Sequence, residues 1–213
     1  MGGNPGLNSD ARLYFPATER NREPIAAGLE PLLPAQGLVL EIASGSGEHL
    51  CFFQQRFARS HPGLRWQGSD PDASHRASLA SWRQQLGLTA MAPPLNLDAS
   101  HSAWPELTEA PALVLCINMI HIAPWAACQG LLAQTARLLA PGAALVLYGP
   151  FLEGAVATSD SNRAFDASLR QRDQRWGIRS LGAVEQEARA QGLLLDGRWP
   201  MPAHNLLVCF RRS

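Results

Sequence analysis

The 213-residue chain has no lysine, so arginine supplies all 18 of its basic side chains, and 18 acidic residues balance them. A net charge of zero suits a polyanion poorly, because binding of nucleic acid through its phosphates needs clustered positive charge. The chain also lacks any apolar run approaching the roughly 18 residues that a membrane-spanning helix requires. We therefore expect no nucleic-acid partner and no membrane partner.

The chain has few cysteines and no cysteine pair. Cys51, Cys116, Cys128 and Cys209 lie far apart and form no C-x-x-C motif. This spacing is typical of buried free thiols and indicates neither a disulfide framework nor a zinc site. The first residues, MGGNPGLNSDARLYF, lack the charged and apolar segments of a signal peptide. The sequence therefore predicts a cytoplasmic protein without a bound metal.

Apolar residues make up 46% of the chain and charged residues 17%, which is enough apolar material for a hydrophobic core. The length fits one domain. The Gly/Asn/Pro-rich start predicts a disordered tail over residues 1–11 and a single domain over residues 12–213.

Short apolar runs alternate with helical patterns along the domain. This alternation predicts an α/β fold with a doubly wound, mostly parallel sheet covered by helices on both faces. The last two strands are too close in sequence for a helical crossover, so they should form an antiparallel hairpin. Seven strands are expected, at 38–42, 64–68, 90–97, 112–117, 143–148, 193–199 and 205–210. In the third of these, Pro93 and Pro94 favour an edge strand or a broken one. The main helices are expected at 24–33, 74–86, 124–139, 162–176 and 181–191.

The first strand ends in an acid followed by a glycine turn, with Glu41, Ala43, Gly45 and Gly47 in order. A dinucleotide fingerprint would need a third glycine where Leu50 stands, which disfavours a nicotinamide-dependent oxidoreductase. The E-x-x-x-G-x-G string instead resembles the first motif of class I S-adenosylmethionine methyltransferases, which have a Rossmann-like fold. The resemblance implies that Glu41 holds the methionine amino end and that the turn lines the nucleoside.

Two further acids follow expected strands. Asp70 comes after the second strand, at the distance from the glycine turn that suits a ribose-binding carboxylate. Asp98 follows the third, where this superfamily often places an acid against the adenine amino group. Either acid could instead cap a turn or a helix. Their order with Glu41, each at a strand end, favours a nucleoside site.

Longer strings outside these motifs resemble the methyltransferase-like 26 family. They begin at Pro16 (PATERNREPI), Ile117 (INMIHI), Tyr148 (YGPF), Ser161 (SNRAFDASLR) and Met201 (MPAHNL). The resemblance runs from about Pro16 to the C-terminus. It implies a methyltransferase fold and S-adenosyl-L-methionine as cofactor, and it supplies no substrate.

Asn118, Met119 and His121 follow the fourth strand, where class I methyltransferases place residues beside the transferable methyl group. Asn118 and Met119 are candidates for cofactor contact, and Asn118 and His121 are candidate catalytic residues. His121 could be a general base, or it could line the pocket, or it could only bind a loop backbone. The polar segment before the first strand, within residues 12–36, could fold over the cofactor, with Arg20 paired to its carboxylate. The alternative is a solvated leader.

The segment 151–180 is expected to build the acceptor pocket against the loop at 118–121. Five arginines between residues 163 and 179 could bind an anionic small molecule, or they could form a solvated helix face. The candidate substrate-binding residues are Tyr148, Asn162, Arg170 and Trp176.

Together these features predict a methyltransferase with a small-molecule substrate. The alternative is a non-catalytic methyltransferase fold that holds the cofactor or a protein partner, because no N-P-P-Y signature follows the fourth strand.

Overall fold

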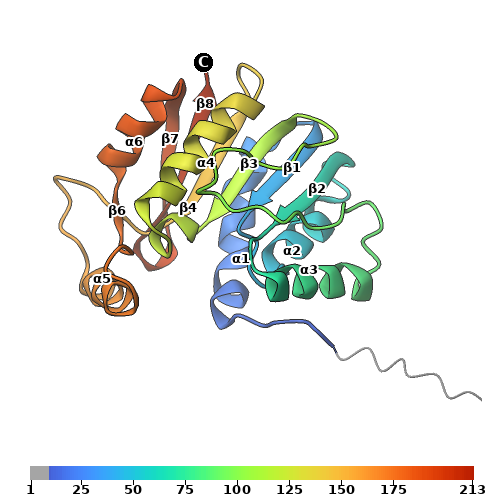
Figure 1. Ribbon diagram of the computed structural model, residues 1–213, viewed down its shortest axis with the longest axis horizontal. Coiled ribbons are helices and arrows are strands. Elements are labelled where there is room, and N and C mark those ends of the chain that lie inside the picture. Colours follow the sequence, from blue (N-terminus) through green and yellow to red (C-terminus); the bar gives the residue numbers. More distant parts are fainter. Residues whose placement is uncertain (1–9) are drawn as a thin grey trace, which may run out of the picture.

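The computed structural model describes residues 10–213 (Figure 1). Its main sheet has six strands in the order β2-β1-β3-β4-β8-β7. The tail expected at residues 1–11 lies, apart from Asp10 and Ala11, outside the described residues. The strands of this sheet are β1 (Gln36–Ile42), β2 (Gly63–Ser69), β3 (Pro111–Ile117), β4 (Ala144–Gly149), β7 (Leu193–Met201) and β8 (Asn205–Arg212). A separate parallel pair joins β5 (Phe151–Leu152) to β6 (Arg179–Ser180).

Helices cover both faces of the sheet. They are α1 (Pro16–Leu29), α2 (Glu48–Phe57), α3 (Ala73–Gln85), α4 (Trp125–Leu138), α5 (Asp160–Arg172) and α6 (Leu181–Ala190). Single 3-10 turns stand at η1 (Glu30–Leu32), η2 (Met119–His121) and η3 (Pro202–His204). The predicted doubly wound α/β class is confirmed, with β1 to β4 parallel.

The hydrophobic core lies in two layers, one on each side of the sheet. Because side chains alternate along a strand, Val114 and Cys116 of β3 join the layer under α4 and α6. Leu113 and Leu115 join the layer under α1, α2 and α3. Figure 1 shows these two groups of helices on opposite sides of the strands. The near-continuous apolar runs of the sequence are therefore explained by burial on both faces.

The prediction of a seventh strand at residues 90–97 is wrong. This segment forms an isolated bridge between Ser69 and Leu95, and the Ala92 N–H also donates to the carbonyl of Trp66 at 3.0 Å. Leu95 donates its N–H to Gly68 and accepts the N–H of Asp70, at 2.9 and 3.1 Å. Pro93 and Pro94 have no N–H to donate, so the ladder does not extend.

The antiparallel hairpin of β7 and β8 is confirmed, and β8 also pairs antiparallel with β4.

Two helix boundaries differ from expectation. Helix α1 begins at Pro16 and contains Pro24, so the predicted start at Pro24 is wrong and the polar leader is itself helical. Helix α5 ends at Arg172 because Asp173 has an extended backbone, which leaves Trp176 beyond it.

All four cysteines are free and buried, as their spacing predicts. Within residues 10–213, none of the helices is both long and apolar enough to cross a membrane.

Candidate functional site

The strand order reverses between β1 and β3. The chain leaves β1 for β2 on one side and returns from β2 to β3 on the other. In open α/β sheets, ligands bind at the carboxyl ends of the strands at such a switch point. The turn 43–47 follows β1 and Asn118 follows β3, so these two parts of the predicted site lie at this edge.

The turn after β1 needs its glycines. Gly45 and Gly47 have positive φ of 56° and 84°. A Cβ on Gly47 would lie 2.7 Å from the Cα of Leu79, so α3 packs directly against the turn. Ala43 also adopts a positive φ, of 58°. Such backbone strain in a residue with a side chain is concentrated at ligand-binding turns.

Asp70 holds this turn. Its side chain is nearly buried, with 6% exposure. One carboxylate oxygen accepts the N–H of Gly45 at 3.0 Å, and the other accepts the N–H of Asp72 at 2.9 Å. The Nδ1 atom of His75 lies 3.1 Å from that second oxygen. The structure therefore brings two separately predicted pieces of the site into direct contact.

Glu41 is the most unusual carboxyl group of the site. It is 1% exposed, and its Oε2 atom has no hydrogen-bond partner among residues 10–213. Burial raises the pKa of Glu41 from 4.5 to about 8, and the charge of Asp70 adds to the rise while the Ser44 side chain opposes it. Buried polar groups normally have partners, so this atom is suited to a ligand.

Among residues 10–213, the polar contacts of the Asp98 side chain are with its near neighbours Ser100 and His101. Its carboxylate accepts the N–H of Ser100 at 2.8 Å and the hydroxyl of Ser100 at 2.7 Å. The hydroxyl contact is the main reason that the pKa of Asp98 is lowered. These bonds match the turn-capping alternative, and the role against adenine stays a prediction.

Asn118 occupies the carboxyl end of β3 with a positive φ of 61°. Its N–H donates to the carbonyl of Tyr148 at 2.7 Å, which joins it to β4. A Cβ on Gly149 would lie 3.1 Å from Asn118 Oδ1 and 2.7 Å from His121 Nε2. Gly149 therefore lets both polar side chains approach the end of β4. Met119 is buried in the core.

His121 is fully buried. The N–H of Arg179 donates to its Nδ1 atom at 3.3 Å, so the neutral ring carries its proton on Nε2. Burial and then the charge of Arg179 lower the pKa of His121 to about 3. The ring edge contacts Phe151, with centroids 5.1 Å apart. The contacts of Nδ1 and of the ring edge fix the orientation of His121, while its Nε2 atom has no hydrogen-bond partner among residues 10–213. The role of His121 as a general base stays a prediction.

The predicted leader residues divide into two groups. Arg20 is exposed on α1. Asn21 points into the molecule, where its Oδ1 lies 2.8 Å from His49 Nε2. Burial lowers the pKa of His49 to about 4, so this ring is neutral.

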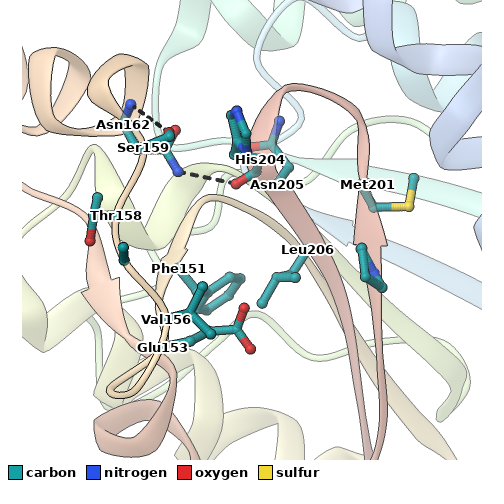
Figure 2. Close-up of a pocket in the computed structure, with 12 residues that line it drawn as sticks. Phe151, Glu153, Val156, Thr158, Ser159, Asn162, Met201, His204, Asn205 and Leu206 are labelled. Carbon is teal, nitrogen blue, oxygen red and sulfur yellow. Dashed lines mark hydrogen bonds between the residues drawn. The ribbon is translucent and has the colours of Figure 1, made fainter.

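A cavity of about 190 Å³ opens between the segment after β4 and the β7–β8 turn (Figure 2). Asn162 of α5 lies at its wall and donates its side-chain amide to the carbonyl of His204 at 3.1 Å. The carboxylate of Glu153 pairs with Arg198 at 2.5 Å. The other lining residues are Phe151, Val156, Ala157, Thr158, Ser159, Pro200, Met201, Asn205 and Leu206.

Only part of the predicted acceptor set lies here. Asn162 lines the cavity, and Arg170 and Trp176 do not. Arg170 pairs instead with Asp166 at 2.7 Å on the same helix. Tyr148 is 2% exposed and belongs to the core layer under α1, α2 and α3, so it does not line the cavity.

Sequence reasoning missed His49, His75 and Phe15. His75 lies against Asp70, and the ring of Phe15 lies against Gly45. A histidine in the first turn of a helix gives no separate sequence signal. For Phe15 the sequence does carry a signal, because Pro16 is suited to the first position of a helix, which places Phe15 at the helix cap.

Solved methyltransferase structures share this fold at low sequence identity. CalO1, a methyltransferase in calicheamicin biosynthesis solved with SAH bound, matches with a TM-score of 0.73 and 15% identity over 92% of this chain and 54% of that chain. An O-methyltransferase family 2 protein from Planctomyces limnophilus, in complex with apigenin, matches with a TM-score of 0.75 and 17% identity, over 92% of this chain and 60% of that chain. The mitomycin 7-O-methyltransferase MmcR matches with a TM-score of 0.76 and 15% identity, over 92% of this chain and 54% of that chain. The chain thus spans between 54% and 60% of these proteins and has the class I methyltransferase fold.

A family model also matches this sequence. Its description is a protein of unknown function, DUF938, and the match runs over residues 12–212. That range is nearly the whole chain and includes every candidate site residue named above. The chain belongs to the DUF938 family.

Proposed function

We propose that this protein is an S-adenosylmethionine-dependent methyltransferase with a small-molecule acceptor. The observation that carries the proposal is the buried Oε2 atom of Glu41, which has no partner in the described part of the chain, beside a glycine turn that Asp70 holds at 3.0 Å. A cationic amino group would give this carboxyl the partner that it lacks. The SAH-bound methyltransferase of the same fold adds support.

In this proposal the chain's residues fit the cofactor chemically. Glu41 binds the amino group, and Asp70 accepts the ribose hydroxyls. Gly45 and Gly47 let the backbone approach the ligand, and the start of α2 faces its carboxylate. When bound, the cofactor supplies an electrophilic methyl group. The further cofactor contacts that we propose are Arg20, Ala43, Asp98, Asn118 and Met119.

We further propose that the acceptor binds in the cavity at Asn162. This cavity adjoins the end of β4, where Asn118 also lies. Methyl transfer needs alignment above all, and Asn118 and the amide of Asn162 would supply it. Because Glu153 is paired with Arg198, the cavity favours a compact, polar acceptor without strong charge.

The arginine-rich segment supports the same choice of acceptor. Arg163, Arg170 and Arg175 each pair with an aspartate of their own segment. The side chain of Arg179 donates to the carbonyls of Ile120 and Ala123, at 2.9 and 2.6 Å. Arginines already paired in this way match the solvated-face alternative better than a grip on an anionic substrate.

The longer strings support a relation to methyltransferase-like 26 proteins within this proposal. Calorimetric titration with S-adenosylmethionine, SAH and NAD tests the cofactor. We expect binding of the first two and none of NAD. Transfer of a labelled methyl group to a metabolite panel tests turnover. Tight SAH binding without turnover on any small molecule would favour the non-catalytic alternative, and no binding would refute the proposal.

A further inference from the structure

The first described residues, Asp10 to Phe15, run along α3 and are called the strap here. The N–H of Leu13 donates to Ser78 Oγ at 2.8 Å, and Trp82 Nε1 donates to the carbonyl of Leu13 at 3.1 Å. The guanidinium of Arg12 lies 4.9 Å from the centre of the Trp82 ring. Two hydrogen bonds and a cation–π contact therefore fix the backbone of the strap to the helix that follows Asp70.

Phe15 ends the strap and caps α1. Its N–H donates to Glu48 Oε2 at 2.7 Å, and its carbonyl accepts the N–H of Thr18 at 2.8 Å. The backbone of Phe15 is therefore held from both sides. A side chain on so constrained a backbone loses little further entropy when a ligand packs against it.

The ring of Phe15 lies over the predicted nucleoside site. Its Cε2 atom is 3.3 Å from the position that a Cβ on Gly45 would take. The ring also meets His75 edge-on, with centroids 6.0 Å apart, and His75 contacts Asp70. Yet the residue is 41% exposed. An aromatic ring held beside a ligand-binding turn and left partly uncovered is suited to pack on a flat ligand group.

We propose that Phe15 is a binding residue for the adenosine part of the cofactor and that the strap forms the outer wall of that pocket. This inference rests on the proposed function. In this proposal the segment before β1 contributes to cofactor binding through Phe15, which precedes α1, as well as through the polar residues of α1. The ligand class is a nucleoside, because an aromatic face packs on a base while the nearby carboxylate of Asp70 accepts hydroxyl groups.

The test compares SAH affinity by calorimetry in the full-length wild type and three variants. Phe15→Ala should weaken binding roughly tenfold, the usual loss of one base-stacking ring. Phe15→Leu keeps the apolar bulk, so it should lose less affinity for SAH. It replaces Phe15→Ala as the test variant if Phe15→Ala does not melt cooperatively. Phe165→Ala is the matched control, because Phe165 is 40% exposed on α5, and it should bind as the wild type does.

The outcomes separate the two proposals. A wild type that binds SAH, with both Phe15 variants binding equally well, overturns the role of Phe15 and leaves the proposed function standing. An equal loss in Phe165→Ala also overturns it, because the effect would then not be local. A wild type that binds neither SAH nor S-adenosylmethionine overturns both.

Discussion

Replacing Glu41 with glutamine should stabilise the protein in the absence of ligand. The folded-state pKa of Glu41 is about 8, against 4.5 for an ordinary glutamate. Between these two values the folded protein holds a proton that the unfolded chain releases. The contribution of Glu41 to stability is therefore lost progressively as the pH rises from 4.5 to 8. Glutamine has a similar shape and carries no such penalty.

The magnitude follows from the shift. One pKa unit corresponds to about 1.4 kcal/mol, so the penalty is about 1 kcal/mol at pH 5 and about 3 kcal/mol at pH 7. We expect the stability of Glu41→Gln to exceed that of the wild type by a margin that grows by about 2 kcal/mol over this range. For a chain of this size, each kcal/mol corresponds to a rise of about 2–4 °C in Tm.

The assay is chemical and thermal unfolding of both proteins at several pH values between 5 and 8. Glu23→Gln is the control, because Glu23 is exposed on α1 and its replacement should give no growing margin. A constant pH-independent difference between Glu41→Gln and the wild type would reflect packing alone. A margin that does not grow with pH would refute the argument that Glu41 is buried and protonated. The same variant should bind S-adenosylmethionine more weakly, since a neutral amide cannot form an ion pair with an ammonium group.

Three further results are expected. Asp70→Ala should weaken SAH binding by roughly tenfold to a hundredfold, as lost charged hydrogen bonds do; Asp72→Ala, which removes only the α3 cap, should lower Tm and keep the affinity. Asn162→Ala should raise the acceptor KM several-fold, by about the value of one hydrogen bond. Arg170→Ala should leave the acceptor KM unchanged. A raised KM in Arg170→Ala and an unchanged KM in Asn162→Ala would show that the acceptor does not bind in the cavity at Asn162. NMR titration should find the His121 ring neutral down to about pH 4, because its pKa is about 3; protonation near pH 6.5 would contradict its burial. Since that pKa lies below the ordinary 6.5, stability should fall as the pH drops below 6.5.

The order of strands and helices could be predicted from local sequence. The apolar runs of β3 and β4, the Pro-Gly stop after α4 and the short link between β7 and β8 each specify an element through contacts near in sequence. The glycine turn after Glu41 was predicted from the E-x-x-x-G-x-G string and its resemblance to a methyltransferase motif, and both glycines adopt a positive φ, which few other residues favour. These features are decided by backbone chemistry and by periodicity.

Tertiary contacts decided the rest. Helix α1 continues through Pro24, and the residues that it buries just after that position are Ile25, Ala26 and Leu29. The contact of Asp70 with Gly45 and that of Phe15 with Glu48 join residues 25 and 33 positions apart. The burial of Glu41 likewise depends on residues distant in sequence. No local pattern encodes such pairs, because burial and charge at each group depend on what the whole chain packs around it.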